Sequence, residues 1–64
     1  MKEFTLFWLT GHAEVITGKD ITEAVNKHYG GGAMRALDFW SHGDERDKYI
    51  WNRIAGEWQR KQPL

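Results

Sequence analysis

Aromatic and apolar residues concentrate in the first part of the chain in the pattern of a β-hairpin. Residues 3–10 are rich in residue types typical of strands, and such residues resume over 13–17. Between them, Gly11 and His12 have the composition of a two-residue turn with glycine first. We therefore expect two antiparallel strands joined by a tight turn.

A two-residue turn would fix which residues of this hairpin face each other. It pairs Trp8 with Val15 and Phe7 with Ile16. Since side chains alternate across a strand, one face then carries Phe4, Leu6, Trp8, Ala13 and Val15, and the other carries Phe7, Leu9 and Ile16. Both faces are apolar, although the exposed face of an antiparallel sheet is usually polar.

A short helix is predicted after the hairpin. Asp20 is a good N-cap residue, and Glu23 stands three residues later in the capping-box position. One stripe of the helix, at positions i, i+3, i+4 and i+7, carries Ile21, Ala24, Val25 and His28. Gly30 then ends the helix most simply in a left-handed conformation.

The second half of the chain predicts further strands. Residues 34–41 read as a strand with Leu37 and Phe39 on one face. A polar loop follows over 42–47, and residues 48–52 alternate again. These two strands would form the second half of an antiparallel sheet.

The C-terminal stretch has two interpretations. Residues 52–56 have the composition of a turn closing on glycine, which would return 57–60 as a further strand and bring Trp58 near Trp51. The apolar residues between 50 and 58 also fit helical spacing, which gives the alternative of a helix over 44–60. Glycine inside that helix would cost about 1 kcal/mol relative to alanine, so the hairpin is favoured.

Together these elements predict a single α+β domain over residues 1–64. We expect an antiparallel sheet of four to five strands in the order ββαββ, with a fifth, C-terminal strand and one short helix on one face.

Composition limits the functions that such a domain can serve. The 64 residues include nine basic and nine acidic residues, no cysteine and nine aromatics, four of them tryptophan. Zero net charge argues against a protein that depends on nonspecific attraction to phosphates. No apolar stretch approaches the roughly 20 residues of a membrane span, so we expect a cytoplasmic protein without a membrane partner.

Catalytic and metal-binding patterns are weak. The three histidines, His12, His28 and His42, are spread over a turn, a helix end and a strand end, without the spacing of a metal site. The carboxylates within 44–47 lack a calcium-loop frame, and Ser41 beside His42 has no further catalytic signature. We therefore expect no enzyme activity, no catalytic residue, no metal and no cofactor.

The aromatic residues are the main indication of function. One short helix can cover one face of a sheet, yet apolar residues occur on both faces. The second face is closed either by the C-terminal segment or by another molecule. We predict a non-enzymatic protein-interaction module that self-associates, as a dimer, or binds another protein. The alternative is a single-stranded nucleic-acid-binding accessory protein that stacks bases on exposed tryptophans, but neutral charge disfavours it. The candidate contact residues are Phe7, Leu9, Ile16, Trp40, Trp51 and Trp58.

Three stretches of the chain also carry a family resemblance. They are the run Gly30-Gly31-Gly32-Ala33 that closes the helix, the next strand Ala36-Leu37-Asp38-Phe39-Trp40, and Tyr49-Ile50-Trp51 with Trp58 after it. Together they resemble small uncharacterised accessory proteins carried by phages and plasmids. The resemblance implies an origin on a mobile element and no particular biochemical activity. Identity of the partner, oligomer number and biological process stay open at this level.

Overall fold

Strands dominate the computed structural model, which describes residues 1–61. The elements in chain order are β1 (Lys2–Trp8), β2 (Ala13–Gly18), α1 (Ile21–Tyr29), the 3₁₀ turn η1 (Ala33–Ala36), β3 (Leu37–His42), the 3₁₀ turn η2 (Arg46–Lys48), β4 (Tyr49–Asn52) and β5 (Glu57–Arg60). The α+β class and the order ββαββ with a fifth strand are confirmed. The C-terminal hairpin is also confirmed in place of a helix over 44–60.

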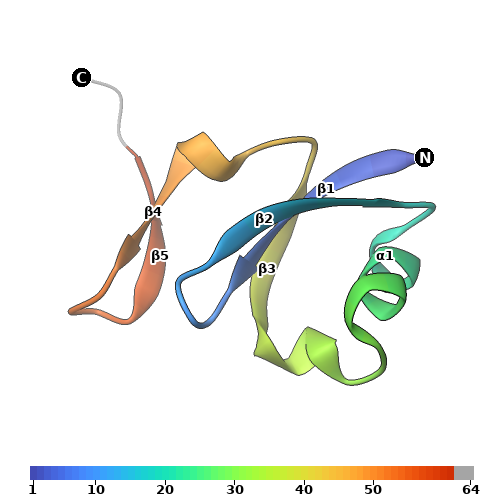
Figure 1. Ribbon diagram of the computed structural model, residues 1–64. Helices are drawn as coiled ribbons and strands as arrows, with labels where there is room; N and C mark the ends of the chain where they lie inside the picture. Colours follow the sequence, from blue (N-terminus) through green and yellow to red (C-terminus); the bar gives the residue numbers. More distant parts are fainter. Residues whose placement is uncertain (62–64) are drawn as a thin grey trace.

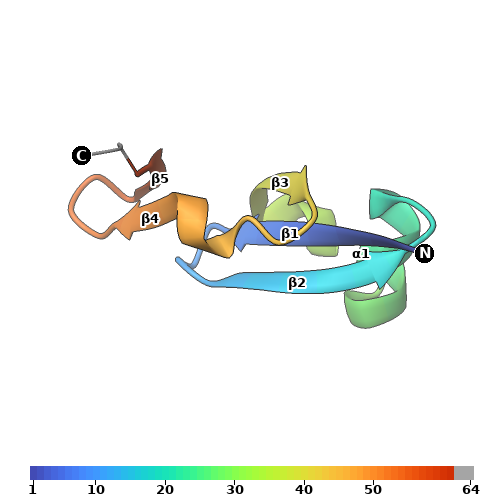
Figure 2. The same ribbon diagram turned by 90° about the horizontal axis from the view of Figure 1, so that it is seen from above.

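The five strands are divided between two antiparallel sheets, where the sequence predicted one. The first has three strands in the order β2-β1-β3, and the second consists of β4 and β5. Figures 1 and 2 show α1 and the β4–β5 hairpin at opposite ends of the molecule, with the three-stranded sheet between them. The domain therefore has a helix-bearing part, residues 1–43, and a C-terminal hairpin part, residues 44–61.

The register of the first hairpin differs from the prediction. Phe7 pairs with Ala13 and Phe4 with Ile16, a shift of three positions from the predicted pairing of Phe7 with Ile16. The turn is longer than two residues, because the Trp8 N–H donates to the His12 carbonyl at 2.9 Å. A shift by an odd number reverses the faces of β2. Ile16 therefore lies on the helix side with Phe4, and the predicted placement of Ile16 beside Phe7 is wrong.

Helix α1 begins and ends as its sequence predicts. The Asp20 carboxylate accepts a hydrogen bond from the Glu23 N–H at 2.8 Å. At the other end Gly30 has φ 88°, and its N–H donates to the Asn26 carbonyl at 2.9 Å. Ala24 is fully buried and approaches β2 so closely that a Cβ placed on Gly18 would lie 2.7 Å from its own. The helix thus packs directly onto the sheet.

Strand β3 starts three residues later than predicted and contains a bulge. Residues 33–36 form η1 instead of continuing the strand. Phe39 pairs with Phe7 and Leu37 pairs with Trp8, so one extra residue is inserted in β3. Leu37 packs against the helix-side core, whereas Phe39 stacks on Phe7 on the other face. Their predicted placement on one face is wrong because the bulge breaks the alternation.

The core on the helix side combines residues of the first sheet and of α1. Its buried members are Phe4, Leu6, Trp8, Ile16, Ala24 and Val25, with Ile21, Ala33 and Leu37 packed against them. Burial of each large apolar side chain contributes roughly 1.5–3 kcal/mol, so this cluster is a main source of the stability of the domain.

The segment that leads to the C-terminal hairpin is tied to the middle of the first sheet. Thr5 of β1 is fully buried, and its hydroxyl donates to the Gly43 carbonyl. The same hydroxyl accepts from the Glu45 N–H at 2.8 Å. This pair of bonds directs the chain across the second face of the sheet, where the hairpin then packs.

Candidate interaction surface

The second face of the first sheet is covered by the chain itself. Phe7 is fully buried, and its ring stacks on Phe39 with a centroid distance of 4.4 Å. Tyr49 and Trp58 of the hairpin meet the Phe7 ring edge-on at 4.9 and 5.0 Å. The Trp58 Nε1–H also donates to the Trp8 carbonyl at 2.9 Å. The sequence was compatible with two ways to cover this face, and in the structure the C-terminal segment covers it.

The six candidate contact residues therefore fall into three groups. Phe7 and Ile16 are buried on opposite faces of the first sheet, so they offer nothing to a partner in this conformation. Trp51 and Trp58 are half-buried and pack against each other at 5.4 Å. The exposed members are Leu9, with 51% of its surface exposed, and Trp40, with 36%.

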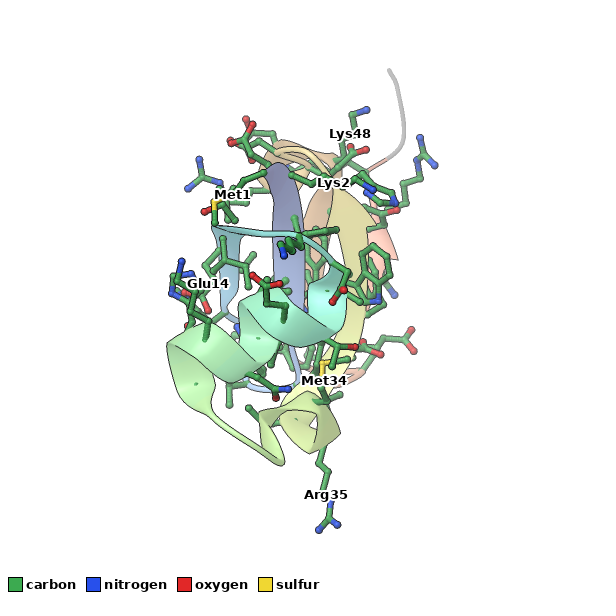
Figure 3. All side chains as sticks on the ribbon, turned by 90° about the vertical axis from the view of Figure 1, so that its right-hand side faces the viewer. Met1, Lys2, Glu14, Met34, Arg35 and Lys48 are labelled. Carbon is green, nitrogen blue, oxygen red and sulfur yellow. The ribbon has the colours of Figure 1, made fainter. Side chains whose placement is uncertain are left out.

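Trp40 lies at the margin of the helix side of the sheet. Its ring meets Phe4 edge-on at 5.5 Å and His42 at 5.1 Å. In Figure 3 helix α1 passes in front of β1 and β2, while β3 lies beside it. Trp40 therefore has two aromatic neighbours, and 36% of its surface remains exposed. An exposed, well-supported tryptophan is the kind of side chain that anchors interfaces.

The backbone of β3 is also available on one side. The Gly43 N–H donates to the Glu3 carbonyl at 2.9 Å, and bonded pairs alternate along an antiparallel ladder. In the register of β1 with β3, Ser41 and Phe39 therefore bond to β1, whereas the N–H and C=O groups of Trp40 and His42 point away from it.

The two outer strands of the first sheet differ in their neighbours. The main contacts of β3 are with β1 and with η1, whereas β2 is flanked by both α1 and η2. A row of unpaired groups at a sheet edge is a template for pairing with another strand. Strand β3 is therefore the more accessible edge.

A shallow pocket of about 390 Å³ lies on the helix side near the first turn. Its lining residues are Trp8, Thr10, His12, Tyr29, Ala33 and Ala36. Glu14 organises the wall: its carboxylate accepts from the Trp8 Nε1–H at 3.0 Å and from the Tyr29 hydroxyl. The predicted register placed Glu14 on the opposite face from Trp8, so the contact between them was not predicted. A prediction of the correct turn length would have placed Glu14 on the same face as Trp8.

The C-terminal hairpin carries a second hollow, of about 720 Å³, on its outer side. It is lined by Ile50, Trp51, Asn52, Arg53, Ile54 and Gln59. Ile54 is 99% exposed at the hairpin tip. Residues 48–61 contain four basic side chains and one acidic side chain, Glu57, which gives this segment a formal charge of +3 within a neutral chain. The basic residues are Lys48, Arg53, Arg60 and Lys61.

Titratable groups do not gather into a reactive centre in the part of the chain that is described. Within residues 1–61 no three His, Asp or Glu side chains lie close enough to hold a metal ion. Hydrogen bonds from Arg46 lower the pKa of the exposed Asp44 carboxyl below its usual value, and the Arg46 side chain lies 2.8 Å from that carboxylate. This is a local pairing at the surface.

Comparison of the chain with protein-family models, with curated proteins and with solved structures found no match. No helix formed by residues 1–61 is long and apolar enough to cross a membrane.

Proposed function

We propose that this domain is a non-enzymatic interaction module that self-associates through the outer edge of β3. The observation that carries the proposal is Trp40, a large aromatic residue left 36% exposed on an edge strand. The aromatic face that the sequence favoured for this role is occupied by the C-terminal hairpin, so the proposed contact moves to the neighbouring edge.

The chemistry of β3 supports this role. Proteins usually protect an exposed edge with lysine, proline or inward-pointing charges. Strand β3 has the sequence Leu-Asp-Phe-Trp-Ser-His and contains no lysine, arginine or proline. Aromatic residues are also enriched at the cores of interfaces. An edge of this composition gains both backbone hydrogen bonds and aromatic burial when a strand is added.

Sedimentation velocity over a concentration series tests the proposal. The wild-type protein should form dimers at concentrations on the order of tens of micromolar, a range typical of modest interfaces. Trp40→Lys places an edge lysine on β3 and should yield monomers. Ile54→Lys is the matched control, because it adds the same charge at an exposed position on the distant hairpin tip. A wild-type protein that stays monomeric throughout the series contradicts the proposal.

A second candidate function, binding of single-stranded nucleic acid, is favoured by one specific observation. The segment 48–61 combines a formal charge of +3 with the half-buried rings of Trp51 and Trp58. Basic side chains beside aromatic rings are the components of a stacking site for bases. The neutral total charge of the chain disfavours binding to nucleic acid. The local charge of +3 in residues 48–61 favours it.

Fluorescence titration with a mixed single-stranded oligonucleotide at low salt tests this candidate. Binding at the hairpin should quench tryptophan emission and weaken as salt rises. Arg53→Ala should lower the affinity, whereas Lys19→Ala removes an exposed basic residue from the helix-bearing part and should not. Unchanged emission at saturating oligonucleotide rules the candidate out.

The cellular setting remains a prediction. We propose a cytoplasmic accessory role on a phage or plasmid, based on the resemblance described above. The genes that neighbour this one test it: a mobile-element context supports the role and a housekeeping operon contradicts it.

A further inference from the structure

We infer that the partner of β3 is β3 of a second copy, paired antiparallel with Trp40 at the two-fold axis, so that Asp38 lies opposite His42 of the partner subunit. This inference rests on the proposed self-association and specifies its geometry. It follows from three features of the edge: which backbone groups point outward, how the charged residues are spaced, and where the strand stops.

The outward-pointing groups restrict the registers that a second strand can adopt. Trp40 and His42 direct their N–H and C=O groups away from β1, as the bond between Gly43 and Glu3 requires. An added antiparallel strand must bond to these residues and not to Phe39. A two-fold axis through Trp40 satisfies this, because each Trp40 then bonds to the other.

The spacing of side chains then selects among the registers. Asp38 and His42 lie at equal distances of two residues on either side of Trp40, and all three residues are exposed. With the axis at Trp40, each Asp38 carboxylate lies opposite an imidazole, which can donate a hydrogen bond to it. Moving the axis one residue towards the C-terminus would place Asp38 opposite Asp44, two like charges. Moving it one residue the other way would place Asp38 opposite Trp40 and leave the carboxylate without a partner.

The pairing groups have no competing ionic partners. Among residues 1–61 the ion pairs join His12 to Glu14, Arg46 to Asp44 and Lys48 to Glu45. Asp38 and His42 take part in none of them, and the contacts of His42 are with the rings of Phe4 and Trp40. Both side chains are free to pair with another molecule.

The length of the edge also fits a self-contained strand pair. At one end Asp38 is the extra residue of the bulge, and only Leu37 of β3 pairs with β1 beyond it; bulges of this kind are common near the end of strand pairing. At the other end the chain leaves the strand at Gly43, which has φ 73°. The segment between them, 38–42, is centred on Trp40. An edge whose charges are arranged symmetrically about its central aromatic residue is complementary to itself, which identifies a second copy as the occupant.

Exchange of Asp38 and His42 tests the register. Asp38→His places histidines opposite each other, and His42→Asp places carboxylates opposite each other, so each single variant should raise the dimer dissociation constant about tenfold. The double variant Asp38→His with His42→Asp restores opposite pairs and should return the constant to within about threefold of the wild type. Circular dichroism and thermal melts confirm that each variant is folded, which is expected because both positions are exposed.

A crosslinking measurement reads the axis directly and does not depend on charge. The chain contains no cysteine, so the double variant Asp38→Cys with His42→Cys keeps Trp40 and introduces two thiols that the proposed register places opposite each other in the two copies. Bonded antiparallel pairs have Cα atoms about 5.5 Å apart, within the range that a disulfide spans. Mild oxidation should therefore give a covalent dimer on a non-reducing gel, whereas Ile54→Cys should not.

The outcomes separate the two proposals. A wild-type protein that is monomeric overturns self-association and the register together. A wild-type dimer whose affinity is unchanged by the single variants, or is not restored by the double variant, overturns the register alone and leaves self-association standing.

Discussion

The helix-bearing part and the C-terminal hairpin part are held in place by different kinds of contact. In residues 1–43 a helix and three strands enclose a cluster whose core members, among them Leu6 and Val25, are fully buried. In residues 44–61 every side chain remains at least partly exposed. The hairpin is attached by aromatic rings, chiefly Tyr49 and Trp58 against Phe7. A two-stranded hairpin alone is marginally stable in water, so its order depends on this docking.

Basic charge is concentrated inside the C-terminal hairpin part, although residues 44–61 as a whole have a formal charge of only +1 and residues 1–43 of −1. The hairpin segment 48–61 has a formal charge of +3, and the remainder of the neutral chain therefore has −3. One part of this small domain supplies stability, and the other supplies a basic, aromatic and exposed surface. The hairpin should consequently open first, at a lower free energy than the global unfolding of the domain.

The largest expected effect is the loss of the ring that joins the two parts. Phe7→Ala removes a fully buried side chain that contacts Phe39, Tyr49 and Trp58. Such truncations cost about 3–5 kcal/mol, a large share of the stability of a 64-residue domain. Urea denaturation should show a population that is already substantially unfolded in water. Leu9→Ala, at an exposed neighbouring position, is the control. A comparable loss of stability in that variant would show that the Phe7 ring is not the contact that joins the two parts.

A second prediction concerns the close approach between the first turn and the hairpin. Gly11 has φ 91°, and a Cβ at this position would lie 2.8 Å from the Trp51 ring. Gly11→Ala should therefore destabilise the protein by about 1–2 kcal/mol from the left-handed backbone alone, and it should push Trp51 outward. Urea denaturation measures the first effect, and a red shift of tryptophan emission reports the second.

Gly31→Ala provides the control for that substitution. Gly31 has an ordinary φ, and nothing lies within 4 Å of an added Cβ. Stability and emission should match the wild type. An equally large effect of both substitutions would contradict the proposed contact between Gly11 and Trp51.

Features set by neighbouring residues could be predicted from the sequence. The ends of α1 depend on Asp20, Glu23 and Gly30, which act within one turn of the helix. The C-terminal hairpin is likewise local, since the Asn52 side chain accepts the N–H groups of Ile54 and Ala55 at 3.0 Å. In both cases the contacts that determine the local structure join residues close in sequence, so the sequence pattern predicts that structure.

Register and burial could not be predicted in the same way. The first turn holds three residues, 9–11, because Trp8 bonds to His12, and β3 contains a bulge that the sequence pattern does not predict. Each change reverses which face a side chain occupies. For the candidate site, the contacts of Trp40 depend on the pairing of β3 with β1, and the burial of Phe7 depends on a hairpin more than forty residues away.

A smaller effect should distinguish docking of the hairpin from folding of the sheet. Trp58→Phe keeps a ring against Phe7 but removes the hydrogen bond to the Trp8 carbonyl, a loss of about 1 kcal/mol. Amide hydrogen exchange should accelerate in β4 and β5 and remain unchanged in the buried strand β1. Trp51→Phe is the control, because the indole N–H of this neighbouring ring makes no such hydrogen bond in the described residues. Equal acceleration in both sheets would contradict the division into two parts.

The smallest expected effect lies where the chain passes from one part to the other. Hydrogen bonds from Arg46 hold the pKa of Asp44 below its usual value, so the pair favours the folded state above the unfolded pKa of Asp44 and loses this contribution as pH falls through the lower, folded pKa. Both groups are exposed, and surface pairs contribute little, so Arg46→Ala should leave stability at neutral pH nearly unchanged. NMR titration should nevertheless show the Asp44 pKa rising towards its ordinary value in that variant, with Arg53→Ala as the control that leaves it in place. An unchanged Asp44 pKa in Arg46→Ala would mean that the pair is absent in solution, and the chain between the two parts would then be held by the bonds to Thr5 and by the bond from the Gly43 N–H to the Glu3 carbonyl.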